Sequence, residues 1–288
     1  MKHYTLHWNR FHLELGHRTA IMGIVNITPD SFSDGGQFYS TEAAVSQAER
    51  LVRAGADIID IGGESTRPYS EGVSAQAEID RILPVIERLT RRIGVPISID
   101  TNKAAVAEAA LAAGAAILND ISALQMDGQM AAVAVKYDVP VILMHMKGRP
   151  RTMQIDPVYD DLLGEVKAFL KTAIERARQA GIASDKIIID PGIGFGKTVA
   201  HNLQIIRRLS VFEELDVPIL IGTSRKAFIR KILSEATATE LSADRPEVET
   251  GTQATIAMAV NNGAHIVRVH NVANTKATVT VLDAIRNA

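Results

Sequence analysis

Polar side chains of complementary kinds follow short apolar runs along this chain. One set combines acids, an amide and an amine, and its members are Asp100, Asn119, Asp190 and Lys226. A carboxylate can accept two parallel N–H bonds from an amidine-like edge, and an ammonium group can donate to a ring carbonyl. The set therefore predicts a site for a flat heterocycle that has both N–H and C=O edges.

A second set of polar residues is cationic or neutral, which suits an anion such as phosphate. Its members are Asn26, Thr66, Arg67, Arg268 and His270. Asn26 has no acid beside it and is a weak metal ligand. This property fits Mg²⁺, which keeps most of its waters and binds substrate phosphates.

Eight short β-branched runs carry these residues at or just beyond their carboxyl ends. The runs are 20–28, 58–62, 97–101, 117–121, 141–146, 187–190, 219–223 and 266–270. Each run is apolar on both faces, as strands of a covered parallel sheet are. Helical patterns separate the runs, for example the apolar stripe over residues 79–93 with Ser74 as its cap. Eight strand–helix units predict a (β/α)8 TIM barrel, whose active site lies at the carboxyl ends of the strands.

An open doubly wound sheet is the alternative architecture, but it places a phosphate loop after its first strand. Here the first strand is followed by NITPDSFSDGG, residues 26–36. The stretch GIGFGKT, residues 192–198, resembles a nucleotide loop, but Pro191 and Lys197 stand where such loops need glycine. The alternating segment before Ala20 predicts a short N-terminal β-hairpin over about residues 1–18, and residues 1–288 are expected to form a single domain.

Composition narrows the class of protein. The chain has 288 residues, 47% of them hydrophobic, with a net charge of −2 and no cysteine. The hydrophobic content is enough for a sizeable core, and the absence of cysteine excludes disulfides and thiolate sites. The net charge shows no basic excess of the kind that would indicate a nucleic-acid partner. The start lacks the apolar core of a signal peptide, and no apolar run approaches the roughly 18 residues of a membrane span. We expect a cytoplasmic protein that binds small molecules, with neither nucleic acid nor a membrane as partner.

His145 is the one histidine that could suggest a metal hydrolase. A zinc hydrolase barrel would need paired histidines at the end of the first strand, which instead reads Asn26-Ile27-Thr28. We therefore do not expect zinc.

Seven motifs occur in the order seen in dihydropteroate synthases, and residues 21–272 resemble that family. The motifs are NITPDSFSDGG, DIGGESTRP, SIDT, LMHMKGRPRTMQ, DPGIGFGKT, GTSRKAFI and RVHNV. The resemblance implies a transferase of folate biosynthesis, a sulfonamide target. Such an enzyme condenses 6-hydroxymethyl-7,8-dihydropterin diphosphate with 4-aminobenzoate to 7,8-dihydropteroate and releases diphosphate. It also implies Mg²⁺ as cofactor and a homodimer.

The same resemblance implies roles for individual residues. The pterin would be held by Asp100, Asn119, Asp190, Lys226 and Arg268. The diphosphate would be held by Asn26, Thr66, Arg67, Arg268 and His270, with Asn26 also meeting Mg²⁺. The aminobenzoate pocket would be bordered by Phe32, Thr66, Arg67, Pro68 and Ser224. The chain departs from the family pattern at Tyr69, where many members have a smaller residue, and at Asn271, where Asp is common.

The segment over residues 26–36 is longer than the usual connection of about 2–6 residues. Our hypothesis is that it forms a lid, which folds with residues 66–68 over the bound diphosphate and excludes water. Asp34 would face the cation that develops at the ring-attached carbon, and Gly35 and Gly36 would be hinges. With Arg268 and His270, which would stabilise the leaving group, Asp34 would complete the catalytic set.

Two other functions share parts of this pattern. A pterin barrel that passes a methyl group to a corrinoid would share the pterin acids without the diphosphate group or the aminobenzoate loop. A non-catalytic paralogue would bind pterin only. The intact stretches at residues 32–34 and 224–226 favour the synthase, and an assay for diphosphate release separates the three.

Overall fold

The computed structural model describes residues 1–27, 36–64, 72–148, 152, 153 and 155–288. Eight parallel strands form its main sheet, in the order β8-β7-β6-β5-β4-β3-β10-β9. Their bounds are β3 (Ala20–Asn26), β4 (Ile58–Gly62), β5 (Ile97–Asp100), β6 (Ile117–Asp120), β7 (Val141–Met144), β8 (Ile187–Asp190), β9 (Leu220–Ile221) and β10 (Ile266–Val269). A bridge between Ile189 and Ile219 brings the β8 and β9 sides of the sheet together. The predicted (β/α)8 TIM barrel is confirmed, and each strand begins within one residue of a predicted run.

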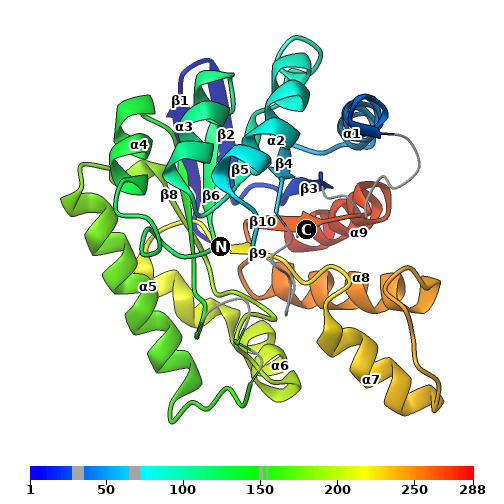
Figure 1. The fold of residues 1–288 in the computed structure, drawn as a ribbon. Coiled ribbons are helices and arrows are strands. Elements are labelled where there is room, and N and C mark those ends of the chain that lie inside the picture. The colour runs from blue at the N-terminus through cyan, green and yellow to red at the C-terminus, as the bar shows by residue number, and fades with distance from the viewer. Residues whose placement is uncertain (28–35, 65–71, 149–151, 154) are drawn as a thin grey trace.

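Helices surround this sheet (Figure 1). They are α1 (Gly36–Arg53), α2 (Ala75–Leu89), α3 (Ala104–Ala112), α4 (Met130–Tyr137), α5 (Leu162–Gln179), α6 (Val199–Arg207), α7 (Ala227–Thr237), α8 (Pro246–Asn261) and α9 (Val272–Arg286), with short 3-10 turns η2 (Ser184–Lys186) and η3 (Leu209–Leu215). Ser74 caps α2 as expected, since its side chain accepts a hydrogen bond from the Ala77 N–H at 3.2 Å. The apolar stripe of this helix faces the sheet, and Ile82, Ile86 and Leu89 are fully buried.

The strands are apolar on both faces because both faces are covered. All five residues of β4 are buried, and so are the first six residues of β3. Side chains that point inward fill the barrel, and those that point outward pack under the helices. Because the rest of each strand is apolar and buried, the polar residues at the strand ends are the ones available to bind a ligand.

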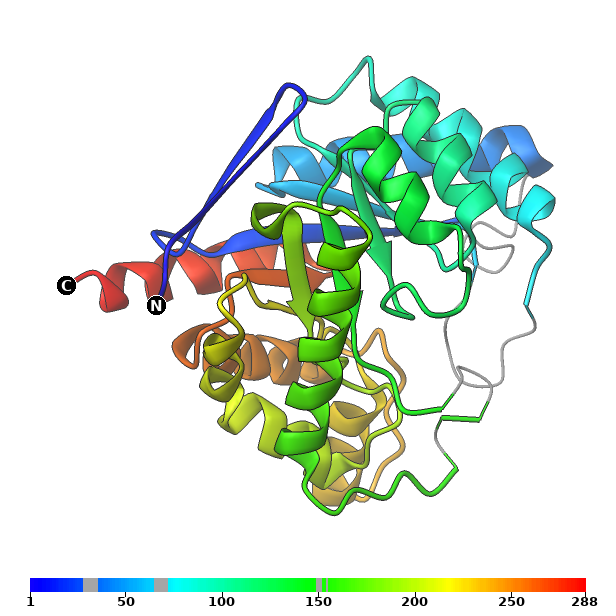
Figure 2. The ribbon, with the colours of Figure 1, turned by 90° about the vertical axis from the view of Figure 1, so that its left-hand side faces the viewer.

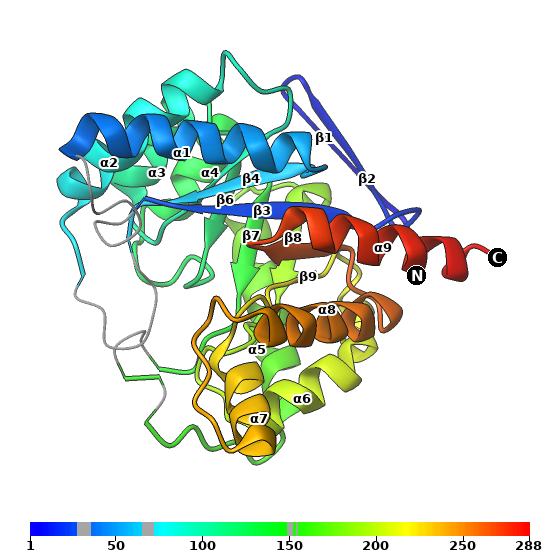
Figure 3. The same cartoon turned by 90° about the vertical axis from the view of Figure 1, so that its right-hand side faces the viewer.

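The N-terminal hairpin is also confirmed. β1 (Tyr4–Trp8) and β2 (Phe11–Leu15) pair antiparallel and bury Leu6, Trp8, Leu13 and Leu15. The first strand packs against η2, which precedes β8, and the Lys2 carbonyl oxygen lies 3.1 Å from Nε2 of His265, which precedes β10. The hairpin therefore covers the amino ends of the strands, and Figures 2 and 3 show it at the same end of the barrel as both chain termini. No helix in the described ranges is long and apolar enough to cross a membrane.

Candidate active site

The register of the parallel strands aligns several predicted site residues. Asn26 pairs with Gly62, Gly62 with Asp100, and Asp100 with Asn119. Asp190 ends β8 in the same way and pairs with Met144. The polar residues therefore gather at the carboxyl ends of the strands, opposite the hairpin.

Arg268 joins three of these strands across the barrel. Its Nε donates to Asp60 Oδ2 at 2.6 Å, and its Nη2 donates to Asp100 Oδ2 at 2.7 Å. Asn119 Nδ2 donates to the same Asp60 carboxylate at 3.2 Å. Burial disfavours the charged guanidinium, but Asp60 and Asp100 raise the pKa of Arg268 above its ordinary value. Arg268 therefore contacts Asp100, one of the acids predicted to bind the heterocycle, and is not separated from that set.

Asp60 is a site residue to which the sequence analysis gave no role. It is fully buried on β4 and accepts hydrogen bonds from both Arg268 and Asn119. The signal that would have found it is the one that found Asp100, an acid near the carboxyl end of an apolar strand.

The two carboxylate oxygens of Asp100 differ in their hydrogen bonding. Oδ2 accepts from Arg268, whereas Oδ1 is buried and has no hydrogen-bond partner. Burial raises the pKa of this carboxyl to about 7, although Arg268 opposes the rise. Buried polar atoms normally find a partner, so Oδ1 is positioned to accept from an N–H group of a ligand.

Asp190 and Lys226 supply the complementary groups. Asp190 Oδ1 accepts from the Gly192 N–H at 2.7 Å, and burial raises the pKa of Asp190 against the effects of that hydrogen bond and of Lys226. Burial, together with the positive charge of Arg268, lowers the pKa of Lys226 to about 8. Asp190 can thus accept a hydrogen bond from a ligand, and Lys226 can donate one.

A small apolar cluster, separate from the main core, lies beside these groups. It consists of Ile121, Met144, Met153 and Phe195. The Lys226 Nζ lies 4.1 Å from the centroid of the Phe195 ring, a cation–π contact. Aromatic and apolar side chains of this kind offer a flat ring a surface to pack against.

His270 and Ser224 contact each other, although they are 46 residues apart in sequence. Ser224 Oγ lies 2.9 Å from His270 Nδ1 and accepts a hydrogen bond from the His270 backbone N–H at 3.2 Å. The residue predicted to bind diphosphate and the residue predicted to border aminobenzoate are therefore neighbours.

Five predicted site residues lie outside the described residues, namely Phe32, Asp34, Thr66, Arg67 and Pro68. Tyr69, where the chain departs from the family pattern, lies outside them too. Asn26 is half-buried at the end of β3. An ideal Cβ at Gly62 would lie 3.7 Å from its Oδ1, an ordinary van der Waals distance, so β4 passes close to this amide oxygen.

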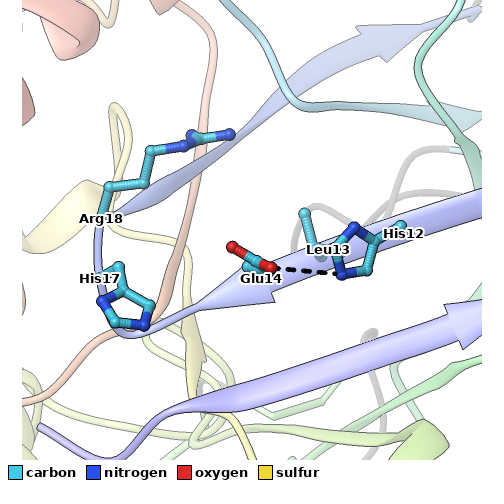
Figure 4. A pocket seen from close by; sticks show the side chains of 5 residues that line it. All are labelled: His12, Leu13, Glu14, His17 and Arg18. Carbon is cyan, nitrogen blue, oxygen red and sulfur yellow. Dashed lines mark ion pairs between the residues drawn. The ribbon is translucent and has the colours of Figure 1, made fainter.

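Other polar features of the fold lie elsewhere or have structural partners. A cavity of about 370 Å³ lies at the hairpin and is lined by His12, Leu13, Glu14, His17 and Arg18 (Figure 4). None of these residues lies at the carboxyl end of a main-sheet strand. The hairpin covers the amino ends of those strands, at the opposite end of the barrel from the candidate site. His145 is buried with its Nδ1 2.9 Å from Lys197 Nζ, and no group of three potential metal ligands among His, Asp and Glu occurs in the described residues.

Several known proteins are similar to this chain in sequence, and some of them also in structure. Residues 22–270 match the model of the family described as pterin binding enzyme. A dihydropteroate synthase of Synechocystis sp. is 46% identical over 94% of this chain and 91% of that protein.

Two solved structures share the fold along nearly their whole length. One is a Yersinia pestis dihydropteroate synthase in complex with a sulfonamide drug, with a TM-score of 0.90, 42% identity, and coverage of 98% of this chain and 99% of that one. The other is a Xanthomonas albilineans dihydropteroate synthase in complex with 7,8-dihydropteroate, with a TM-score of 0.83, 42% identity, and coverage of 96% and 97%. The chain therefore belongs to the dihydropteroate synthases, within the family of pterin-binding enzymes.

Proposed function

We propose that the strand-end residues carry out the reaction of this family in two adjoining subsites, one for the ring and one for the diphosphate. The reaction condenses 6-hydroxymethyl-7,8-dihydropterin diphosphate with 4-aminobenzoate to 7,8-dihydropteroate and diphosphate. The observation that carries the proposal is the buried, unpartnered Oδ1 of Asp100. It lies in a network of acids that Arg268 holds at one end of the barrel.

In the ring subsite, Asp100 and Asp190 accept hydrogen bonds from ring N–H groups, and Lys226 donates to the ring carbonyl. Asn119 adds an amide to the same cluster through its contact with Asp60. Phe195 and its apolar neighbours pack against the ring plane. Arg268 orients Asp100 and lies close enough to contact the ring as well.

The chemical step exchanges one bond for another at the ring-attached CH2 carbon. The C–O bond to diphosphate breaks, and diphosphate leaves with the electron pair. The amine nitrogen of 4-aminobenzoate bonds to the same carbon and then loses a proton. Ring nitrogen electrons stabilise a cation at that carbon, so the leaving group can depart first. His270 and Arg268 stabilise the charge that builds up on the diphosphate.

Mg²⁺ is the cofactor that fits the diphosphate subsite. Asn26 offers a single neutral amide oxygen, and the described residues contain no group of three acidic or histidine ligands. This donor set is too small for a metal cage made of protein alone but suits a cation held mainly by substrate phosphates and water. Asn26 would hold Mg²⁺ there, and the bound ion would supply positive charge to the leaving diphosphate.

The remaining roles rest on the family resemblance. Thr66 and Arg67 contribute to the diphosphate subsite, and Phe32, Thr66, Arg67, Pro68 and Ser224 border the aminobenzoate pocket. Asp34 faces the developing cation from the segment over residues 26–36, which acts as a lid. The protein forms a homodimer through its outer helices.

The direct test is release of diphosphate from the pterin diphosphate in the presence of 4-aminobenzoate and Mg²⁺. We expect equal amounts of 7,8-dihydropteroate and diphosphate, and loss of both when Mg²⁺ is omitted. A pterin-binding paralogue would bind the substrate without releasing diphosphate, and a methyltransferase barrel would require a methyl donor instead. Either result would overturn the proposed function.

A further inference from the structure

The turn that links β9 to α7 carries residues that serve both proposed subsites. Ser224 contacts His270 of the diphosphate subsite, and Lys226 belongs to the ring subsite. Arg225 stands between them, and a hydrogen bond from the Lys226 backbone N–H to the Thr223 carbonyl oxygen, at 3.2 Å, closes the turn. The conformation of this turn therefore determines where both side chains point.

Arg225 has a backbone conformation that an arginine rarely adopts. Its φ is +58°, in the left-handed region, and it is the third of the four residues of the turn. Glycine is the usual residue at such a position, because a Cβ makes the left-handed conformation unfavourable. The turn keeps its shape only if other contacts hold Arg225 in place.

Thr252 of α8 makes a backbone contact that holds Arg225. Its Oγ1 accepts a hydrogen bond from the Arg225 N–H at 3.1 Å and donates to the Val248 carbonyl oxygen at 2.9 Å. The hydroxyl is thus both acceptor and donor, and Thr252 is only 1% exposed. One helical turn further on, Thr255 Oγ1 lies 2.9 Å from Thr223 Oγ1, so α8 contacts the turn at two places.

The side chain of Arg225 is held less firmly than its backbone. Its Nε lies 4.0 Å from Glu249 Oε2, which is beyond hydrogen-bond distance. Both atoms are buried, and neither has a hydrogen-bond partner among the residues that the structure describes. The hydrogen bond to Thr252 is therefore the stronger restraint on Arg225.

Packing alone does not require a hydroxyl on this face of α8. The other buried residues of the helix are apolar, namely Val248, Ile256, Ala259 and Val260. A valine has nearly the shape of threonine and could fill the position of Thr252 without the hydrogen bond. The hydroxyl therefore adds a polar contact to a face that otherwise packs as hydrophobic core.

We propose that Thr252 is a positioning residue for the two subsites. Its hydroxyl holds Arg225 in the left-handed conformation, and the turn then directs Ser224 to His270 and Lys226 to the ring. The inference rests on the proposed roles of Lys226 and His270.

The test compares the effect of Thr252 in two backgrounds, the wild type and Arg225→Gly, because glycine adopts a positive φ without strain. Thr252→Val removes the hydroxyl and keeps the shape, whereas Thr252→Ser keeps the hydroxyl. Thr250→Val is the matched control, since the exposed Thr250 makes the same kind of bond within α8, to the Pro246 carbonyl oxygen at 3.1 Å. Isothermal titration with 6-hydroxymethylpterin gives the dissociation constant of each protein.

In the wild-type background, Thr252→Val should weaken pterin binding about five- to tenfold, because the turn loses one hydrogen bond of ordinary net strength and no longer presents Lys226 correctly. In the Arg225→Gly background, the same substitution should change the dissociation constant by less than about twofold. Thr252→Ser and Thr250→Val should bind pterin as the wild type does. The KM for the pterin diphosphate should rise in parallel with the dissociation constant.

An equal loss in both backgrounds would show that Thr252 does not act through the conformation of residue 225 and would overturn the proposal. If Thr252→Val does not fold, hydrogen exchange of the Arg225 amide in the wild type decides the question. The hydrogen bond to Thr252 predicts slow exchange that slows further when pterin binds, and exchange as fast as that of an open loop contradicts it. A wild-type protein that binds no pterin would refute the proposed function as well, so the two failures are distinguishable.

Discussion

Asp100→Asn is the substitution that tests the ring subsite most closely, because the structure determines how the new amide must lie. Arg268 Nη2 donates to one oxygen of Asp100 at 2.7 Å and can only donate. The amide oxygen of the variant therefore faces Arg268. The amide NH2 then takes the place of Oδ1, the buried oxygen without a partner.

A ring N–H would then meet a donor instead of an acceptor. The complex loses a charge-assisted hydrogen bond and gains an unpaired buried donor, which together cost about 2–4 kcal/mol. At 1.4 kcal/mol per tenfold change, the expected loss of affinity is about 30- to 1,000-fold. Isothermal titration of 6-hydroxymethylpterin at pH 7.5 measures it, with Asp80→Asn on the exposed face of α2 as the matched control.

Instability does not explain such a loss. Because burial raises the pKa of Asp100 in the folded protein to about 7, its ionisation costs stability as pH rises from the ordinary range of an aspartate through 7. The Asn variant avoids this cost, so its midpoint of thermal unfolding at pH 7.5 should be at least that of the wild type. An affinity within about threefold of the wild type would refute the assignment of Asp100 as a ring ligand, since a threefold change is under 1 kcal/mol.

Three further changes probe other parts of the account. Burial lowers the pKa of Lys226 to about 8, so the donor to the ring carbonyl loses its charge as pH rises through 8 and pterin affinity should fall. Measurement of the affinity from pH 7 to 9 tests this, and an affinity that does not change over that range contradicts it. Asp34→Ala should lower kcat about 100-fold, the usual loss when one group that stabilises developing charge is removed, and unchanged turnover would exclude Asp34 from the chemistry. Gly192→Ala should reduce the free energy of unfolding by about 2–4 kcal/mol in urea, because φ is +71° and the Cβ would overlap the His145 carbonyl oxygen; a wild-type midpoint would show that the loop can shift.

Local pattern was enough to predict the strands and the residues that end them. Asp100 and Asp190 each end a short, mostly apolar strand, and Asn119 is the next-to-last residue of another, so their place at the carboxyl ends of a parallel sheet follows from the strand pattern itself. The N-terminal hairpin was equally visible, because its buried and exposed residues alternate.

Contacts across the barrel could not be predicted in the same way. The charge of Arg268 placed it with the anion-binding residues, and the family resemblance also placed it at the pterin. Neither indicated that the closed barrel brings it against Asp60 and Asp100, 208 and 168 residues away. In the sequence, Lys197 was only a residue that breaks a nucleotide-loop pattern, whereas in the fold it is buried and contacts His145, which follows β7. The start of α8 lies within the polar stretch of residues 241–250, because Pro246 suits the first turn of a helix.

The central claim is that one substrate spans a ring subsite and an adjoining anion subsite at the carboxyl ends of the strands. A crystal structure with Mg²⁺ and a non-hydrolysable analogue of the pterin diphosphate tests it most directly. We predict the ring against Asp100, Asn119, Asp190 and Lys226, with the phosphates beside Asn26 and His270. A ring bound away from these acids, or phosphates directed away from His270, would contradict the account.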